Sequence, residues 1–429
     1  MSSVREPIGV IGTGYVGLVT AAGFAELGGD VYCVDIDAGK IEGLRRGEIP
    51  IYEPGLAEMV ARNAQRLHFS TALDEALERA RLLFVAVGTP PTYSGDADLS
   101  AVHAVVDAMP ASDRHALVMK STVPVGTGRS IQRIFAEKGK TGFRYVSCPE
   151  FLKEGSAIKD FLKPDRVVVG DDGDWAGDAV VDLYAPLGAP LVRTDVASAE
   201  MVKLASNAFL ATKISFINEI ANVCEETGAN VMEVARGMGL DDRIGPKFLQ
   251  PGIGFGGSCF PKDVSALKQL AGNSGYHFQL LNAVIEVNEL QKRRVIAKLQ
   301  KHLGSLVGKR VALLGLAFKP ETDDMREASS LVLAARLLAD GAAVSAYDPV
   351  AEEEARTLMP GVQFADGALE AVEGADAVVL VTEWKEFGDL DWQAVGERMT
   401  GDLVVDGRNA LDAAAVRGAG LAYDGVGIR

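Results

Sequence analysis

The sequence has few cysteines, and none lies in a pattern typical of a metal or disulfide site. The four are Cys33, Cys148, Cys224 and Cys259, far apart, with no CxxC pair and no cysteine–histidine cluster of zinc spacing. We therefore expect neither a metal site nor a disulfide framework. In a reducing compartment, the question for each thiol is whether it is reactive or merely buried.

The chain also lacks long apolar runs and an excess of positive charge. No segment approaches the ~20 continuous apolar residues of a membrane helix, and the N-terminal MSSVREP leads into a strand-like run without an apolar signal core. The net charge of −16 argues against nucleic acid or an anionic membrane as a partner. We expect a cytoplasmic protein that binds any anionic ligand with a few placed cations and backbone amides.

What the sequence does have is a regular alternation of strand-like and helix-like segments. With 429 residues, of which 48% are hydrophobic, two or three domains are expected. In the N-terminal part, strands are predicted at Ile8–Ile11, Val31–Asp35, Leu82–Val87, Leu117–Lys120, Tyr145–Cys148 and Val167–Val169. Helices are predicted between them, including Tyr15–Leu27, Leu99–Met109 and Trp175–Tyr184. This alternation predicts a parallel, doubly wound sheet.

The middle of the chain reads as helical, and the alternation then returns. Predicted central helices are Ala199–Glu226, Val231–Met238, Pro261–Ala271 and Asn282–Leu303, the last of them a candidate spine between domains. After Lys309, strands are predicted at Arg310–Leu316, Val344–Tyr347, Ala377–Val381 and Leu403–Val405, with helices at Ser329–Asp340 and Glu352–Leu358. The fold class expected is α/β, with two doubly wound, Rossmann-like domains (1–196 and 305–429) joined by a central helical region (197–304).

A glycine-rich turn after the first predicted strand indicates a dinucleotide site. IGVI runs into Gly12-Thr13-Gly14-Tyr15-Val16-Gly17 and then into a helix. A GxGxxG alone is weak, but this context suits a tight turn, close approach of pyrophosphate and a helix N-terminus aimed at it. Asp35 closes the next strand, where a carboxylate holds the adenosine ribose, and with Asp37 it would repel a 2′-phosphate. NAD is therefore expected as the cofactor, and a ligand-free glycine turn is the alternative.

Further turns at strand ends extend this site. Val87-Gly88-Thr89-Pro90 and Ser121-Thr122-Val123-Pro124 each follow a predicted strand, and ligands of open α/β sheets lie over such carboxyl ends. Thr122 can donate its hydroxyl to the nicotinamide or to a bound water. Taken alone, Thr122 would more simply be a capping or turn residue.

The sharpest local signal is Gly254-Phe255-Gly256-Gly257-Ser258-Cys259-Phe260-Pro261-Lys262-Asp263. Glycines allow the backbone to lie against a ligand, and Pro261 suits the first turn of a helix. Cys259 would then precede a helix N-terminus, where the dipole and the nearby Lys262 favour thiolate. We expect Cys259 to be a nucleophile, whereas Cys33, in a strand, and Cys224, in an apolar helix, are expected to be buried thiols.

Two further clusters carry groups suited to catalysis. In Pro149-Glu150-Phe151-Leu152-Lys153-Glu154-Gly155, two carboxylates four residues apart would share one helical face. Lys203 and Asn207 have the same spacing on a predicted helix and would place an ammonium and a carboxamide on one side. Such a pair is usually a solvated face, so its interpretation depends on the other motifs.

Taken together, the motifs resemble those of a known enzyme family. In order along nearly the whole chain stand GTGYVG, VGTP, STVPVGT, PEFLKEG, VKLASNAFLATKISFINEIA, GFGGSCFPKD and GLAFKPETDDMREASS. They resemble the UDP-glucose/GDP-mannose dehydrogenase family. The cysteine loop is similar to that of the members that oxidise UDP-glucose at C6, because Ser258 stands where the UDP-N-acetylhexosamine enzymes usually have His.

This resemblance implies roles for particular residues. Cys259 would attack the C6 aldehyde, Lys203 and Asn207 would stabilise the oxyanion, Asp263 would orient or deprotonate a water, and Glu154 or Glu150 would assist hydrolysis. The implied catalytic set is Cys259, Lys203, Asn207, Asp263, Glu154, Thr122 and Glu150. Cofactor contacts are expected from Gly12, Gly14, Tyr15, Val16, Gly17, Asp35, Lys40, Thr122, Glu154, Lys262 and Arg326. Substrate contacts are expected from Glu150, Phe151, Leu152, Lys153, Glu154, Lys203, Asn207, Arg243, Phe248, Leu249, Gln250, Pro251, Gly252, Gly256, Lys319 and Arg408.

The activity implied is a four-electron oxidation of UDP-glucose to UDP-glucuronate, in which a cysteine traps the aldehyde and a thioester is then hydrolysed. A homodimer through the central helices, with Arg243 acting across the interface, is also implied. Within the family, a GDP-mannose or UDP-N-acetylhexosamine dehydrogenase is the alternative. Outside it, the alternatives are a β-hydroxyacid dehydrogenase, which takes one hydride and needs no cysteine, and a non-catalytic NAD-binding protein.

Overall fold

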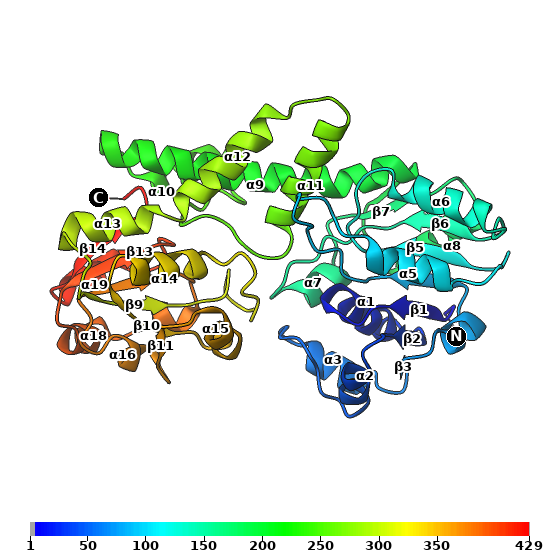
Figure 1. Cartoon of the computed structure of the whole chain (residues 1–429), viewed down its shortest axis with the longest axis horizontal. Helices are drawn as coiled ribbons and strands as arrows, with labels where there is room; N and C mark the ends of the chain where they lie inside the picture. The colour runs from blue at the N-terminus through cyan, green and yellow to red at the C-terminus, as the bar shows by residue number, and fades with distance from the viewer. Residues whose placement is uncertain (1–4, 429) are drawn as a thin grey trace. The chain divides into compact units, whose positions relative to one another are not determined.

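Residues 5–428, which the computed structural model describes, fall into two units. The first comprises the chain as far as Ser206 together with Ser265–Tyr276, and the second comprises Asn207–Val264 and the chain from His277 onward. Each has its own sheet and hydrophobic core (Figure 1).

The first unit is built on a sheet of eight strands in the order β3-β2-β1-β4-β5-β6-β7-β8. Neighbouring strands are parallel, except that β6 and β7 pair antiparallel at Ser147 and Gly170. The strands are β1 (Ile8–Ile11), β2 (Val31–Val34), β3 (Leu67–Ser70), β4 (Leu82–Val85), β5 (Ala116–Met119), β6 (Arg144–Ser147), β7 (Val167–Gly170) and β8 (Leu191–Thr194). Strands such as β1, β4 and β5 are buried along their whole length because helices cover both faces.

Helices lie on both faces of this sheet. Leu18, Met59 and Val180, from α1, α3 and α8, pack in one core cluster, whereas Val102 of α5 and Ile131 of α6 pack in another. The helices of this unit are α1 (Tyr15–Glu26), α2 (Ala38–Arg45), α3 (Leu56–Arg62), α4 (Leu73–Arg79), α5 (Ser100–Ala108), α6 (Thr127–Glu137), α7 (Ala157–Leu162) and α8 (Trp175–Tyr184), with a 3₁₀ turn η1 (Ala185–Leu187). The predicted doubly wound arrangement is confirmed for this unit.

The second unit carries a parallel sheet of six strands in the order β11-β10-β9-β12-β13-β14. The strands are β9 (Arg310–Leu314), β10 (Ala343–Tyr347), β11 (Gln363–Phe364), β12 (Ala377–Leu380), β13 (Leu403–Asp406) and β14 (Ala422–Gly425). The helices that accompany them are α14 (Ser329–Ala339), α15 (Glu352–Leu358), α16 (Ala368–Ala371), α17 (Lys385–Gly388), α18 (Trp392–Arg398) and α19 (Ala413–Gly418).

This second sheet is also covered on both faces. Leu299 of α13 (Arg294–Leu303) and Leu333 of α14 pack in one cluster, and Val395 of α18 and Val416 of α19 in the other. Figure 1 shows α13 and α14 on one side of these strands and α16 and α18 on the other. The second doubly wound domain predicted from the sequence is therefore confirmed.

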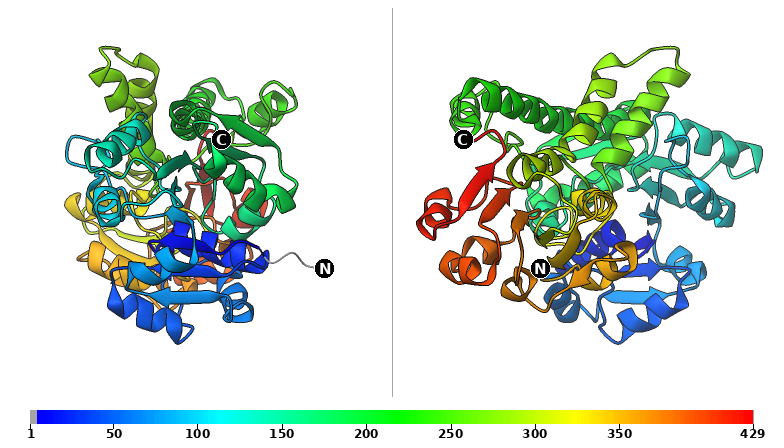
Figure 2. Two further views of the ribbon diagram at one scale, coloured as in Figure 1. Left: turned by 90° about the vertical axis from the view of Figure 1, so that its right-hand side faces the viewer. Right: turned by 60° about the vertical axis from the view of Figure 1, so that its left-hand side comes forward.

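The long helix of the structure is α9 (Val196–Thr227), an uninterrupted helix of 32 residues (Figures 1 and 2). The predicted spine 282–303 is not one helix, because α12 (Gln279–Gln291) and α13 are separated by a turn at Lys292 and Arg293. The other helices of the middle of the chain are α10 (Val231–Gly239) and α11 (Phe260–Asn273). Over residues 5–428, no helix combines the length and apolar character that crossing a membrane requires.

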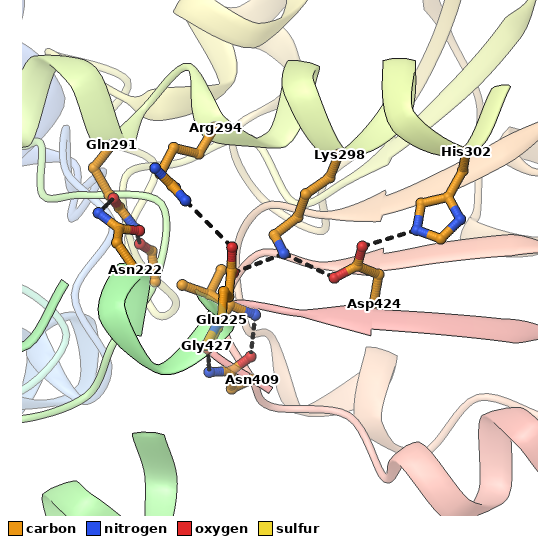
Figure 3. A network of polar contacts seen from close by, with 11 residues as sticks. Asn222, Glu225, Gln291, Arg294, Lys298, His302, Asn409, Asp424 and Gly427 are labelled. Atoms are coloured by element: carbon orange, nitrogen blue, oxygen red, sulfur yellow. Dashed lines mark hydrogen bonds and ion pairs between the residues drawn. The ribbon is translucent and has the colours of Figure 1, made fainter. Parts of the chain in front are cut away.

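Within the second unit, a polar network ties the end of α9 to α13 and β14 (Figure 3). Lys298 donates to Glu225 at 2.7 Å and to Asp424 at 2.8 Å, and His302 lies 2.9 Å from Asp424. Glu225 also accepts hydrogen bonds from Arg294 and from the N–H of Gly427. The network anchors the C-terminal end of α9 through Glu225.

Candidate active site

The turn between β1 and α1 has the backbone that a dinucleotide requires. Gly12 has a φ of 93°, and a Cβ there would lie 2.7 Å from the carbonyl oxygen of Ala86. A Cβ on Gly17 would lie 1.9 Å from the carbonyl oxygen of Gly12, so the helix packs closely on the turn. A Cβ on Gly14 would meet nothing within 4 Å, which leaves open space where a pyrophosphate approaches the N-terminus of α1. These residues fit NAD.

Asp35 follows β2 and is held in place by its surroundings. Its carboxylate accepts hydrogen bonds from the N–H and the hydroxyl of Thr13, both at 2.8 Å, and pairs with Lys40 at 3.3 Å. Burial raises the pKa of Asp35, but hydrogen bonds from Thr13 and Asp37 and the charge of Lys40 outweigh it, so the pKa lies below the ordinary value of an aspartate. The acid is thus ionised at neutral pH, as a carboxylate that binds ribose hydroxyls must be.

The two turns after β4 and β5 are joined to each other. The hydroxyl of Thr89 donates to the carbonyl oxygen of Thr122 at 2.9 Å, and Thr122 is half-buried. A residue that sequence reasoning missed holds the continuation of this turn: Glu200 of α9, 2% exposed, accepts the N–H groups of Gly126 and Gly128 at 2.7 and 2.8 Å.

The segment after β6 is a loop and not a helix, so the prediction that Glu150 and Glu154 share a helical face is wrong. The Glu150 carboxylate accepts the N–H of Leu152, the residues from Cys148 to Ser156 form no helix, and α7 begins only at Ala157. The guanidinium of Arg166 lies over the ring of Phe151, with its central carbon 3.5 Å from the ring centroid.

Glu150 instead meets Lys203. The ammonium of Lys203 lies 2.9 Å from Glu150, and the two residues are 3% and 5% exposed. Burial raises the pKa of Glu150, but the charge of Lys203, the hydrogen bonds from Lys203 and Leu152 and the charge of Lys120 keep it below the ordinary value of a glutamate. Lys203 therefore does not lie on a solvent-exposed face of its helix, which was the alternative interpretation of the sequence.

In the second unit, Cys259 directly precedes α11, as predicted. The thiol is half-buried, its Sγ lies 3.5 Å from the hydroxyl of Ser258, and its carbonyl oxygen accepts the N–H of Asp263 in the first turn of the helix. Cys33, Cys148 and Cys224 are buried. Burial raises the pKa of the Cys33 thiol, which agrees with its expected role as an inert core residue.

Asn207 and Asp263 form a buried pair near the start of α11. The Asn207 amide donates to one oxygen of Asp263 at 2.6 Å, and Lys262 donates to the other at 2.6 Å. Asn207 is 6% exposed and Asp263 is fully buried. The amide orientation of Asn207 is therefore fixed by a carboxylate, which leaves its second N–H available in a defined direction.

Three buried amides that the sequence did not single out hold the loop before Cys259. Asn218 accepts the N–H of Gly252 at 2.8 Å, and Gln291 donates to the carbonyl oxygen of the same glycine at 2.8 Å. Asn288 bonds both the N–H and the carbonyl oxygen of Phe255. A carboxamide inside an otherwise apolar helix face was the available signal, and it is a weak one.

The glycines of this loop are needed by the protein's own packing. A Cβ on Gly256 would lie 2.2 Å from the carbonyl oxygen of Glu327, and the N–H of Gly257 bonds the carbonyl oxygen of Arg326 at 2.8 Å. Arg408 donates to the carbonyl oxygens of Gly254 at 3.0 Å and Phe318 at 3.3 Å. The structure thus brings together the cysteine loop, Arg408 and the segment that carries Lys319 and Arg326.

Other predicted binding residues lie around this loop or further out. Leu249, Pro251 and Gly252 are buried, Gln250 is exposed, and Phe248 adopts a positive φ of 64°. Arg243 extends into solvent with 88% of its side chain exposed and pairs with Asp241. Within residues 5–428, no group of three or more His, Cys, Asp or Glu side chains is placed to hold a metal ion.

Comparison with known proteins gives the same family along the chain. Residues 6–188, 197–290 and 312–413 match the NAD binding, central and UDP binding domains of the UDP-glucose/GDP-mannose dehydrogenase family. The chain is 46% identical to UDP-glucose 6-dehydrogenase TuaD of Bacillus subtilis, over 98% of this chain and 93% of that protein.

Solved structures agree. A UDP-glucose dehydrogenase from Pyrobaculum islandicum is 40% identical, with a TM-score of 0.92 over 100% of this chain and 99% of that one. A UDP-D-ManNAc dehydrogenase from Pyrococcus horikoshii is 27% identical, with a TM-score of 0.84 over 98% and 99% of the two chains. The chain belongs to the UDP-glucose/GDP-mannose dehydrogenase family, and its N-terminal part is an NAD-binding domain.

Proposed function

We propose that this protein oxidises the C6 alcohol of UDP-glucose to the carboxylate of UDP-glucuronate, with two NAD consumed per substrate and Cys259 as the covalent nucleophile. The observation that carries the proposal is the position of Cys259, half-buried directly before α11, in a chain whose other cysteines are buried. The choice of UDP-glucose is supported by the higher identity to the two UDP-glucose dehydrogenases than to the UDP-D-ManNAc enzyme.

NAD supplies the chemistry of hydride acceptance, once for the alcohol and once for the trapped aldehyde. The thiolate of Cys259 adds to the C6 aldehyde and gives a thiohemiacetal, which loses a hydride to become a thioester. Water then adds to the acyl carbon, the carbon–sulfur bond breaks, and the thiolate and the acid are released. The helix N-terminus of α11 favours the thiolate before attack and after release.

Each tetrahedral stage carries negative charge on oxygen, for which Lys203 and Asn207 are the proposed donors. Asp263 holds the Asn207 amide through a bond of 2.6 Å, and Glu150 holds the Lys203 ammonium at 2.9 Å. We propose that Glu154 and Asp263 together serve the hydrolytic water, because the family resemblance implies both carboxylates for this step.

The binding roles that we propose for individual residues are those that the family resemblance implies. We propose that Gly12, Gly14, Gly17 and Asp35 hold NAD, and that Arg408 and Lys319 bind UDP beside the loop that contains Gly256. The division into domains at 1–196, 197–304 and 305–429 stays a prediction. A reducing, cytoplasmic location is proposed because the chemistry requires Cys259 as a free thiol.

A homodimer through the central helices is part of the proposal. Phe209, Phe216 and Val223 recur every seven residues along α9 and are 66%, 49% and 56% exposed. Large apolar side chains repeated on one side of a helix are typical of a surface that a partner covers.

The test is the stoichiometry of the reaction on a panel of nucleotide sugars. With UDP-glucose and excess NAD, we expect two NADH for each UDP-glucuronate formed, and slow or absent turnover of GDP-mannose and UDP-N-acetylhexosamines. One NADH per product would contradict the four-electron reaction, and turnover of another sugar in place of UDP-glucose would reassign the substrate.

A further inference from the structure

Glu53 is a buried carboxylate outside the set of residues discussed so far. It lies between α2 and α3 and is 6% exposed. One of its oxygens, Oε2, accepts the hydroxyl of Tyr15 and the N–H of Gly155, the latter at 2.7 Å. The other oxygen, Oε1, accepts the N–H of Ala157 at 2.8 Å. One side chain therefore holds the first turn of α1 and the loop after β6, both in the first unit.

Tyr15 also contacts the loop after β6. Its hydroxyl lies 3.5 Å from the carbonyl oxygen of Lys153. Burial, the hydrogen bond to Glu53 and the charges of Glu53, Glu154 and Glu150 all raise the pKa of Tyr15, so the phenol stays protonated and remains a donor.

These contacts bracket Glu154. The residue before it, Lys153, is touched by Tyr15, and the residue after it, Gly155, is bound by Glu53 and has a positive φ of 75°. We propose that Glu53, acting through Tyr15 and the backbone of Gly155 and Ala157, is a positioning residue that fixes the orientation of Glu154 for the hydrolysis step. This inference rests on the proposed function, in which Glu154 serves hydrolysis.

The substitution Glu53→Gln keeps the size of the side chain but changes its hydrogen bonding, so it tests the positioning role without creating a cavity. A carboxylate accepts at both oxygens, whereas a carboxamide of the same shape accepts at one and donates at the other. If the NH₂ group takes the place of Oε2 it faces the N–H of Gly155, and if it takes the place of Oε1 it faces the N–H of Ala157. In either orientation one backbone N–H loses its acceptor, and the loop that carries Glu154 shifts.

The experiment compares Glu53→Gln with Tyr15→Phe. The Tyr15→Phe substitution keeps the two hydrogen bonds that Glu53 accepts from backbone N–H groups but removes the tyrosine hydroxyl. Glu58→Gln, the same change at an exposed position on α3, is the matched control. The readouts with UDP-glucose and NAD are the NADH formed in the first turnover, the steady-state kcat, and the fraction of Cys259 that carries a covalent adduct by intact mass.

For Glu53→Gln we expect NADH formation in the first turnover to be retained, kcat to fall about 10- to 100-fold, and the adduct on Cys259 to accumulate, because hydrolysis becomes the slow step. For Tyr15→Phe we expect the same pattern with a smaller fall in kcat. Glu58→Gln should match the unmodified protein. A substitution that merely reduced the folded fraction would lower all rates together and would leave no adduct.

Equal activity and equal adduct in Glu53→Gln and Glu58→Gln would overturn the positioning role and leave the proposed function standing. A proportional loss of every step in Glu53→Gln without an adduct would overturn it as well. If Glu53→Gln does not fold, the Tyr15→Phe variant decides. An adduct on Cys259 in that variant supports the inference, and the absence of an adduct overturns it. Failure of the unmodified protein to oxidise UDP-glucose would instead overturn the proposed function.

Discussion

At the scale of single residues, the four cysteines differ mainly in where the fold places them. Cys33, Cys148 and Cys224 are enclosed, with Cys33 in the core of β2 and Cys224 in the cluster around α9 and α10. Cys259 alone among them combines partial exposure with a helix start that follows it directly. The reactivity that we propose for Cys259 therefore rests on its position and not on its residue type.

Replacement of Cys259 by serine tests this difference. Because the hydroxyl is a far weaker nucleophile than a thiolate, Cys259→Ser should lower UDP-glucuronate formation by about 10³-fold or more while NAD binding persists. The matched control is Cys224→Ala, which removes a buried thiol and should keep the activity of the folded protein. Equal activities of the two variants would contradict a nucleophilic role for Cys259.

The residues of the site were only partly predictable from the sequence. Gly12, Asp35 and Cys259 stand in motifs whose local geometry follows from residue type, and the structure has them in that geometry. Asn288 and Gln291 could not be singled out, because their work is to bond backbone that is distant in sequence. The spacing of Glu150 and Glu154 suits a helix, but the segment is a loop in which Glu150 is drawn into a buried ion pair with Lys203, a partner distant in sequence.

At the scale of elements, strands such as β1, β4 and β12 were predictable because they are short, apolar and buried on both faces. The more exposed strands β3, β8, β11 and β14 were not predicted, because they lack a buried apolar run. The break between α12 and α13 was not predictable. It falls at Lys292 and Arg293 without a glycine or proline, and Lys292 is buried there between Glu289 and Glu327, at 2.8 and 3.7 Å. The local sequence carries no mark of the contact with Glu327, which lies in a distant part of the chain.

The network in Figure 3 should contribute to stability in a pH-dependent manner. Lys298→Met leaves Glu225 and Asp424 without their shared ammonium, and we expect a loss of about 2–3 kcal/mol in the free energy of unfolding at pH 7, measured with urea. The matched control is Lys301→Met, an exposed lysine on the same helix, which should change little.

The way in which this contribution to stability changes with pH follows from the pKa of Glu225. Burial raises the pKa of Glu225, but Lys298, the N–H of Gly427 and Arg294 outweigh it, so the folded-state pKa lies below the ordinary value. Its contribution is therefore complete above the unfolded pKa of about 4.3 and disappears as the pH falls through the lower folded value. The difference between Lys298→Met and the unmodified protein should shrink below about pH 4, and a difference that grows there would contradict the assignment.

The stripe on α9 makes a second prediction at this scale. Phe216→Glu places a charge in the middle of the Phe209–Phe216–Val223 row and should shift the protein from dimer to monomer in light scattering coupled to size exclusion. The matched control is Val307→Glu, which changes an apolar residue that is 73% exposed but lies outside α9. A monomeric unmodified protein, or dimers in both variants, would contradict a dimer through this helix.

At the scale of the whole molecule, a chain with a net charge of −16 must recognise an anionic cofactor and an anionic substrate locally. In the proposed function, the cofactor is held by a glycine turn and helix N-terminus in the first unit, and the substrate by a glycine loop in the second unit that buried amides and Arg408 hold in place. The proposed reaction also requires NADH to leave between two hydride transfers while the sugar stays bound through Cys259. A covalent intermediate explains how an aldehyde is retained during that exchange.

The most direct measurement is the intact mass of the Glu154→Gln variant after incubation with UDP-glucose and NAD. The account predicts a sugar-nucleotide adduct that maps to Cys259 and is absent when Cys259→Ser is combined with Glu154→Gln. A folded, NAD-binding Glu154→Gln variant that oxidises UDP-glucose yet carries no adduct on Cys259 at any time would contradict the thioester route.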